Sequence, residues 1–239
     1  MNNLNEPNDR RKFIRNTGIL VGLTALGNRA FAAQNSPLFG HQSEDEKVLP
    51  SEDLMREHGV LKRILLIYGE ISERLKNGKD FPPQTLSRSA DIIRNFIEDY
   101  HEKLEENYLF PRFEKAGKLV ELVRVLRVQH ERGRVLTDLI KRSANSRDIK
   151  DRTKRQGLIR DINSFIRMYN PHEAREDTVL FPAFRTLVSS NEYDSLGEEF
   201  EDEEHKLFGE DGFEKIVETV AGLEKSIDIY DLDKFTPKI

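Results

Sequence analysis

Apolar side chains recur every three or four residues along four stretches of this sequence, which is the spacing of an amphipathic α-helix. The four stretches cover residues 54–68, 86–108, 123–140 and 158–179. No stretch of useful length alternates apolar and polar residues as a half-buried strand would. The pattern predicts an all-α protein in which four helices with short connections form an up-down-up-down four-helix bundle.

Turn-forming residues indicate where these helices end. They lie at positions 77–78 and 82–83, at Pro111 and Gly117, and at 143–148. Pro171 falls inside the fourth stretch and is expected to kink or loosen that helix. One further helix is expected from about Tyr193 to Ile229. The predicted bundle therefore occupies residues 51–188, and a C-terminal helical extension occupies residues 189–239.

The composition narrows the chemistry that these helices can carry. The chain of 239 residues has a formal net charge of −5, so no basic nucleic-acid-binding surface is expected. It contains no cysteine, which excludes disulfides, thiolate metal sites and cysteine nucleophiles. Any metal ion must therefore be held by histidine, aspartate or glutamate, and only six histidines are present.

The first 32 residues have the features of an export signal. An Arg10-Arg11 pair followed by Phe13 precedes a short glycine-rich apolar run, and an Ala-x-Ala site ends at Ala32. This arrangement resembles a twin-arginine signal, which implies export of the folded protein to the periplasm by that machinery. The apolar run is too short to span a bilayer, and no membrane span is expected in the mature chain. Residues 33–50 have no periodicity and are interpreted as a linker.

The sequence contains two copies of one unit. Segments 101–113 and 172–184 both read H-E-x-x-E-[ED]-x-x-L-F-P-x-F, and they begin 71 residues apart. A lone histidine precedes each segment, and these two histidines, His58 and His130, are 72 residues apart. Because the matches pair four of the six histidines, we interpret the chain as two related helical hairpins.

The repeated histidines and glutamates lie on the apolar faces of the predicted helices. Two pairs, His101 with Glu105 and His172 with Glu176, are each four residues apart, so each pair shares one helix face. The two lone histidines occupy the same stripe on the other two helices. A buried glutamate is costly unless it is paired or binds a cation. Six such groups at one level of a bundle suit iron or manganese, with zinc as an alternative.

Each of these residues also has an ordinary interpretation. A single histidine on an apolar helix face is more often a core residue than a ligand, and a His-x-x-x-Glu pair also forms on helix surfaces. A metal site is favoured only for the six together, because both duplicated motifs and both lone histidines have to be explained at once. Four flanking acidic residues are expected to be solvated or to contact the ligands from outside: Glu102, Glu106, Glu173 and Asp177.

This arrangement resembles the hemerythrin family, in particular bacterial members with an H…HxxxE…H…HxxxE pattern, over roughly residues 50–188. The resemblance implies a four-helix bundle that holds two non-haem iron ions. The implied ligands are His58 and His101 for one ion, His130 and His172 for the other, and Glu105 and Glu176 as bridges. Oxygen carriers of this family have a further histidine one turn after the lone histidine of the third helix. Arg134 stands there in this chain and cannot be a ligand at ordinary pH, which disfavours simple oxygen carriage.

Four more residues are candidates for the surroundings of the centre. His205 ends an acidic run on the extra helix, and Glu204 precedes it. This pair supplies a further ligand, a contact just outside the ligands, or only a surface histidine. Tyr108 and Tyr169 lie on the stripes that face the centre. Either tyrosine would donate a hydrogen bond to a bound oxygen ligand or serve only in packing.

Two classes of function stay open. The leading hypothesis is a periplasmic di-iron protein that binds O₂, peroxide or nitric oxide for sensing, detoxification or carriage, with an unidentified redox partner. In the detoxification form it would be an oxidoreductase acting on peroxide or nitric oxide. The alternative is an iron-binding protein for sequestration without turnover, or a structural bundle with zinc or no metal. Ferritin-like proteins place Glu before His at a spacing of three, whereas His comes first here at a spacing of four, which argues against that family.

Overall fold

The computed structural model describes residues 49–238, and every regular element in that range is helical. Three elements, η1 to η3, are π-helical, and η4 is a 3₁₀ turn. The elements are, in chain order, α2 (Pro50–Asn77), α3 (Pro83–Ile92), η1 (Ile93–His101), α4 (Glu102–Leu104), η2 (Glu105–Leu109), α5 (Phe110–Ala116), α6 (Val120–Ser143), α7 (Ser146–Lys150), α8 (Arg152–Arg175), η3 (Glu176–Leu180), α9 (Phe181–Arg185), α10 (Ser190–Phe208), α11 (Gly212–Ser226) and η4 (Leu232–Phe235). The all-α prediction is confirmed for this part of the chain.

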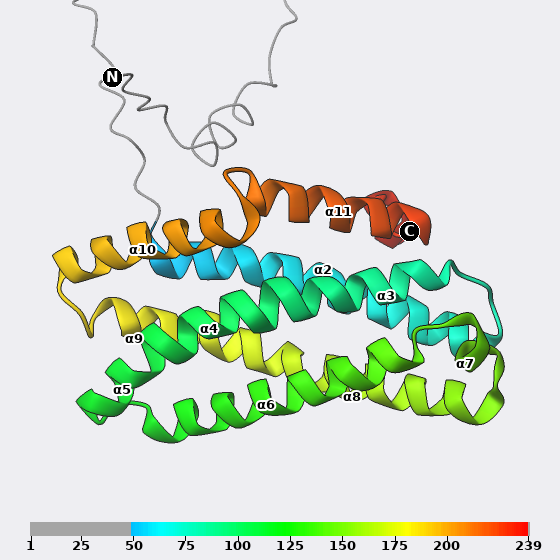
Figure 1. The fold of residues 1–239 in the computed structure, drawn as a ribbon, viewed down its shortest axis with the longest axis horizontal. Coiled ribbons are helices and arrows are strands. Elements are labelled where there is room, and N and C mark those ends of the chain that lie inside the picture. Colours follow the sequence, from blue (N-terminus) through cyan, green and yellow to red (C-terminus); the bar gives the residue numbers. More distant parts are fainter. Residues whose placement is uncertain (1–48, 239) are drawn as a thin grey trace, which may run out of the picture. The chain divides into compact units, whose positions relative to one another are not determined.

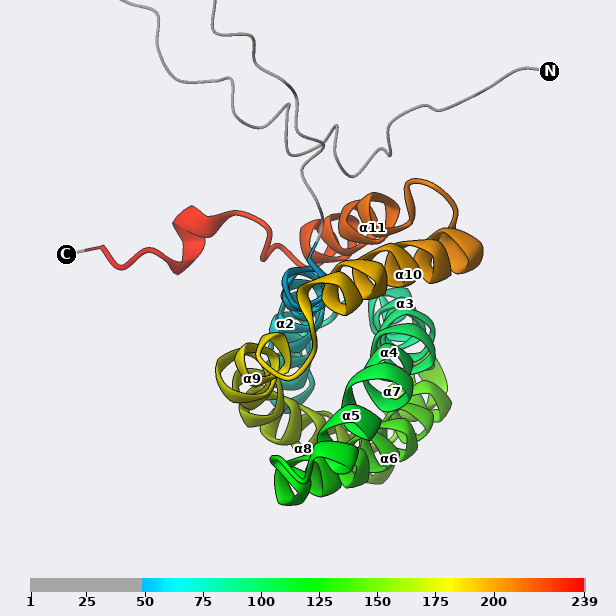
Figure 2. The ribbon, with the colours of Figure 1, turned by 90° about the vertical axis from the view of Figure 1, so that its left-hand side faces the viewer.

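Four long helical segments enclose a common core (Figures 1 and 2). They are α2, the continuous run from α3 to α5, α6, and the run from α8 to α9. Helix α2 packs on α8 and η1, and α6 packs on α8 and α3, so the four segments contact one another in a ring. The apolar stripes meet inside this ring, where one representative of each segment is fully buried: Leu54, Ile97, Leu126 and Phe165. The chain is thus a helical bundle whose interior can hold a site built from facing helices.

Three predicted helix ends are confirmed, and one of them is the end of α6 at Ser143. Gly78 closes α2 and Gly117 closes α5, each with a φ near +65°, a left-handed conformation that glycine adopts without a steric penalty. The end predicted at Pro111 is wrong, because the helix continues through it to Ala116. The π-helical turn η2 ends two residues before this proline, and η3 ends two residues before Pro182. A widened turn moves the preceding carbonyl groups away from the proline ring and so lets the helix continue.

The helix is not interrupted at Pro171, where a kink or loosening was expected. Helix α8 runs through this proline without interruption, and the π-helical segment begins five residues later, at Glu176. Glu105 and Glu176, which occupy the same position in the duplicated motif, therefore each start a π-helical turn. Such turns are often found at functional sites, where they change the direction of side chains.

The C-terminal extension consists of two helices rather than one. Helix α10 ends at Phe208, Gly209 has a φ of 81°, and α11 begins at Gly212. Both helices pack on α2, and α11 also contacts α3 (Figure 2). The side chain of Glu204 accepts a hydrogen bond from the backbone N–H of Phe213 at 3.0 Å and so satisfies one donor in the first turn of α11. This extension covers one side of the bundle.

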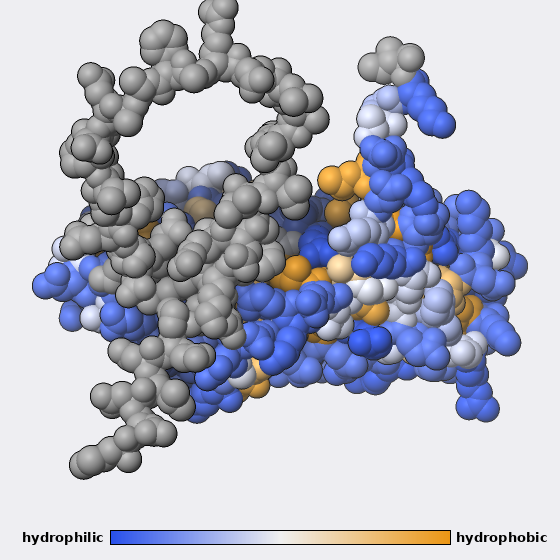
Figure 3. Space-filling model, turned by 90° about the horizontal axis from the view of Figure 1, so that it is seen from above, coloured by the Kyte–Doolittle hydropathy of each residue, from blue (hydrophilic) through white to orange (hydrophobic). Residues whose placement is uncertain are grey.

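The surface of the described part is polar over most of the face drawn in Figure 3, with apolar residues in small groups. No helix between residues 49 and 238 combines the length and the apolar character that crossing a bilayer requires. The predicted signal, residues 1–32, and all but the last two residues of the predicted linker lie outside the described residues.

Candidate metal centre

The structure brings the six predicted side chains together in the interior of the bundle. All six are buried, with exposed fractions between 0 and 3%. Two groups have ligand atoms within 4.8 Å of one another: His58 with His101 and Glu105, and His130 with His172 and Glu176. Each group takes its two histidines from different helices. The convergence depends on the four segments packing in register, and the repeat places the two groups in matching positions.

The four histidines form two pairs, and in each pair the two Nε2 atoms point toward each other. Nε2 of His58 lies 3.0 Å from Nε2 of His101, and Nε2 of His130 lies 3.2 Å from Nε2 of His172. Two neutral imidazoles that point their lone pairs at each other repel. A proton or a metal cation between the two nitrogens of a pair removes this repulsion.

Each glutamate contacts a histidine from both pairs. Oε2 of Glu105 lies 3.8 Å from Nε2 of His101 and 3.4 Å from Nε2 of His130. Oε2 of Glu176 lies 3.4 Å from Nε2 of His58 and 3.1 Å from Nε2 of His172. A carboxylate placed between two histidine pairs in this way is suited to link two cations.

The buried oxygens of these glutamates have no hydrogen-bond donors within the described part of the chain. This holds for Oε1 and Oε2 of both Glu105 and Glu176. A buried carboxylate without donors costs free energy unless a cation or a proton neutralises it. The donor set, four imidazole nitrogens and two carboxylates without sulfur, fits a pair of divalent first-row metal ions.

The other nitrogen of every histidine is held by a side-chain oxygen. The Nδ1 contacts are His58 with Asp177 (2.7 Å), His101 with Glu57 (2.8 Å), His130 with Glu106 (3.1 Å) and His172 with Gln129 (2.9 Å). An acceptor at Nδ1 keeps the proton there and leaves the Nε2 lone pair for a metal. The sequence pattern leaves Glu106 and Asp177 open as outside contacts, whereas the roles of Glu57 and Gln129 were not predicted. Their signal was their position, directly before the lone histidine of each repeat.

The pKa values reflect a centre without metal. Burial alone lowers the pKa of His58, but the hydrogen bond with Asp177 and the close contact with the carboxylate of Glu176 outweigh this effect and raise the pKa to about 9. Burial lowers the pKa of His130 to about 4. Burial and the negative charge of Glu176 raise the pKa of Glu105 well above its usual value. For Glu176 the cost of burial is outweighed by His172 and His58, which hold its pKa well below the usual value. In the metal-free centre, these shifts favour a proton on His58 and on Glu105, whereas His130 and Glu176 favour the unprotonated form.

Comparison with known proteins agrees with this geometry. Residues 49–184 match the family described as Hemerythrin HHE cation binding domain. This chain belongs to that family. Uncharacterized proteins of Mycobacterium bovis and Mycobacterium tuberculosis are 54% identical to it over 194 residues, which is 81% of this chain and 76% of each relative. No solved structure matches the chain.

In this hemerythrin-family chain, Arg134 adds no ligand to the candidate centre and binds acidic side chains instead. Its guanidinium donates hydrogen bonds to Glu102 at 2.8 Å and to Glu106 at 2.7 Å. Lys62, which follows His58 by four residues as Arg134 follows His130, forms an ion pair with Glu173. Each lone histidine is thus followed, one turn later, by a cation that binds an acidic residue of the duplicated motif.

Tyr169 lies next to the centre, as its stripe predicts. Its ring packs edge-on against His172, and its hydroxyl donates a hydrogen bond to Glu102 at 2.7 Å. Gly133 makes room for this hydroxyl, because a Cβ at that position would lie 1.9 Å from the hydroxyl oxygen. Burial raises the pKa of Glu102 to about 8, although Arg134 and Tyr169 both act to lower it. A tyrosine and a carboxyl group are therefore buried together beside His172.

Tyr108 is not where its stripe predicts. Its hydroxyl donates a hydrogen bond to Glu199 at 2.9 Å, and its ring packs against Phe200, so it faces helix α10. A role for Tyr108 in a pocket at the centre is not supported. The reason is local, since Tyr108 belongs to the π-helical segment η2, in which the regular helical spacing does not hold.

His205 and Glu204 do not join the six. No group of closely spaced potential ligands within residues 49–238 includes His205. Glu204 instead lies with Asp53 and Glu57 in a cluster of three buried acidic residues, and it satisfies the N–H of Phe213. Its connection with the centre is indirect, through Glu57 and the hydrogen bond of Glu57 to His101.

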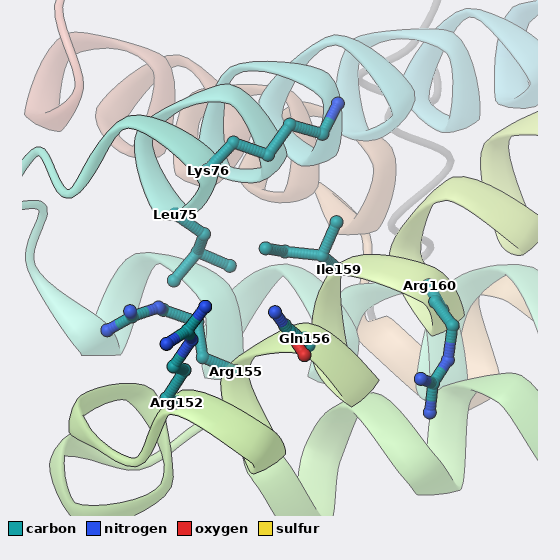
Figure 4. A pocket seen from close by; sticks show the side chains of 7 residues that line it. All are labelled: Leu75, Lys76, Arg152, Arg155, Gln156, Ile159 and Arg160. Carbon is teal, nitrogen blue, oxygen red and sulfur yellow. The ribbon is translucent and has the colours of Figure 1, made fainter.

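A surface pocket of about 560 Å³ lies between the end of α2 and the start of α8 (Figure 4). Its charged lining consists of Lys76, Arg152, Arg155 and Arg160. None of the six centre residues lines it. Because the six side chains are almost fully buried, a ligand that reaches the centre has to be small.

Proposed function

We propose that this chain is a di-iron protein of the hemerythrin family that senses or reacts with a small oxidant: dioxygen, peroxide or nitric oxide. The observation that carries this proposal is the set of four buried carboxylate oxygens of Glu105 and Glu176, which lack donors in the described structure and lie between two pairs of histidine nitrogens. Two cations satisfy all of these groups at once. The four long segments would then form the up-down-up-down bundle predicted from the sequence.

The roles follow from the contacts. His58 and His101 would hold one ion, and His130 and His172 the other. Glu105 and Glu176 would link the two ions, since each touches both pairs. Nitrogen and carboxylate ligands without thiolates are compatible with iron, manganese and zinc. Iron(II) can supply electrons for the reduction of a small oxidant, which zinc cannot.

In this function, the protein orients the ligand side chains and keeps water and large molecules away from the centre. The oxygens at Nδ1 fix the direction of all four imidazoles, so the ligand atoms are oriented before a metal arrives. The burial of all six side chains keeps bulk water and large reductants away from the centre. Arg134 is tied to Glu102 and Glu106 and adds no ligand, which leaves coordination positions open and favours sensing or turnover over carriage.

Metal analysis combined with oxidant exposure tests the proposal. The wild-type chain, produced with iron and reduced without oxygen, is expected to contain two iron ions and to change its visible spectrum on exposure to O₂, peroxide or nitric oxide. A reversible band supports sensing, and consumption of the oxidant supports turnover. A protein with two irons that responds to none of the three supports sequestration instead, and a protein that takes up no iron contradicts the proposal.

We also propose that the protein acts in the periplasm after twin-arginine export. The support is the sequence of residues 10–32 alone. Replacing Arg10 and Arg11 with lysine is expected to leave the protein in the cytoplasm with its metal content unchanged, as measured by cell fractionation. An undiminished periplasmic yield would contradict this proposal. Replacing Lys12 with arginine, which preserves the arginine pair, serves as the control.

A further inference from the structure

The two halves of the centre have the same kinds of ligand residues but differ in the side chains that contact Nδ1 of their histidines. The residue before each lone histidine contacts Nδ1 of the histidine in the following motif: Glu57 contacts His101, and Gln129 contacts His172. These positions match in the repeat, since both precede the lone histidine by one residue. One half therefore has a carboxylate where the other has a neutral amide.

The His58–His101 half is surrounded by negative charge. Both of its Nδ1 atoms contact carboxylates, Asp177 at 2.7 Å and Glu57 at 2.8 Å. Glu57 is fully buried, and its second oxygen has no hydrogen-bond donor within residues 49–238. The buried acidic residues Asp53 and Glu204 lie beside it.

The His130–His172 half has little net charge around it. Of its two Nδ1 atoms, only that of His130 lies near carboxylates, at 3.1 Å from Glu106 and 3.9 Å from the buried Glu102. Glu102 is paired with Arg134 at 2.8 Å. Glu106 is itself paired with Arg134 at 2.7 Å and with Lys103 at 2.5 Å. The other Nδ1 contacts the side-chain oxygen of Gln129, which carries no charge.

This difference acts on a bound cation in two ways. A carboxylate that accepts the Nδ1 hydrogen makes the imidazole a stronger base, and its negative charge also attracts the cation directly. An amide oxygen increases the basicity of the imidazole less, and it has no net charge to attract the cation. Changes in such outer contacts typically alter metal affinity by about 10- to 100-fold.

We propose that the two metal positions are unequal and fill in order: the first divalent cation binds at His58 and His101, and the second at His130 and His172, more weakly. Glu57 and Gln129 are the positioning residues that set this order. The inference rests on the proposed two-metal function and adds to it which position binds first and why.

A titration of the metal-free chain with Zn²⁺ against a coloured chelator tests the order without any redox reaction. The wild type is expected to bind two ions in two steps, with affinities separated by about 10-fold or more. His172→Ala is expected to keep the tight step, and His101→Ala to keep only the weak one. These two variants assign the steps to the two halves.

Reciprocal exchange of the two positioning residues gives the sharper test. Glu57→Gln is expected to weaken the tight step and Gln129→Glu to strengthen the weak step, each by about 10-fold or more. The double exchange is expected to reverse the order, with His172→Ala then removing the tight step. A purely structural role for Glu57 would weaken binding without any rescue by Gln129→Glu.

The outcomes separate this inference from the proposed function. Two ions bound with one common affinity in the wild type and in both exchange variants would overturn the order while leaving the two-metal proposal in place. The same holds if His101→Ala keeps the tight step. A wild-type chain that fails to bind two ions contradicts the proposed function itself.

Discussion

Glu105→Gln is expected to reduce metal affinity by at least about 100-fold and to leave at most one ion bound per chain, while the stability of the metal-free protein hardly changes. Glu105 touches a histidine of each pair, so its loss affects both positions. In the metal-free protein, burial and the negative charge of Glu176 raise its pKa well above the usual value, which favours the neutral form of the carboxyl. Glutamine then replaces a neutral group of nearly the same shape. The free energy of unfolding in urea with a chelator is therefore expected to stay within about 1 kcal/mol of wild type.

The control for this variant is Glu114→Gln in α5, on the same continuous helical run. Glu114 is exposed and pairs with Arg127 at 3.1 Å, so its replacement should alter neither metal content nor stability by much. Two ions bound to Glu105→Gln with wild-type affinity would show that this carboxylate is not a ligand. A large loss of metal-free stability would show that it is ionised and paired in the empty centre.

The sequence was sufficient to predict the helices and the meeting of the six side chains, because both depend on repeated spacing. The duplicated motif fixed which residues share a face, and burial of those faces brought the faces together. The position of Tyr108 was predicted wrongly because the prediction relied on the same regular helical spacing that placed the six centre residues correctly. The prediction assumed 3.6 residues per turn, and η2 departs from that value at Glu105. A π-helical turn leaves no clear mark in a pattern of apolar residues.

The Nδ1 contacts were not predicted because they join residues on different helices. The contact of Glu57 with His101 spans 44 positions and depends on how α2 and η1 are packed. No spacing rule within one helix reports such a contact. The repeat could have suggested it, since Gln129 occupies the matching position.

Two glycines in the sequence could have indicated the break between α10 and α11. Gly209 and Gly212 lie three positions apart within the helix that was predicted as continuous. Glycine is common just after a helix end, and the φ of 81° at Gly209 is one that other residues rarely adopt. The apolar periodicity on both sides concealed this end, because both helices pack on α2.

The metal-free protein is expected to lose stability as the pH rises from 6.5 to 9, a range in which most proteins change little. The pKa of His58 is about 9 in the fold and near 6.5 when unfolded, so its contribution is fully present below pH 6.5 and is lost as the pH rises through 9. This loss amounts to about 3 kcal/mol. Glu102 acts in the same direction, since its pKa of about 8 in the fold exceeds its ordinary value of 4.5.

Urea unfolding with a chelator at several pH values measures this loss, and Asp177→Asn provides the matched variant. Asp177 is the first of the groups that raise the pKa of His58, so its replacement should flatten the fall in stability above pH 6.5. At acidic pH the dependence of stability on pH reverses, because the depressed pKa of His130, about 4, makes the fold lose stability as the pH falls below 6.5.

Metal binding should remove the loss of stability at alkaline pH, since a coordinated imidazole carries no proton at Nε2 in either pH range. If the metal-free protein were equally stable at pH 6.5 and 9, His58 would not hold a proton between the two Nε2 atoms, and the repulsion within that pair would have to be relieved in another way.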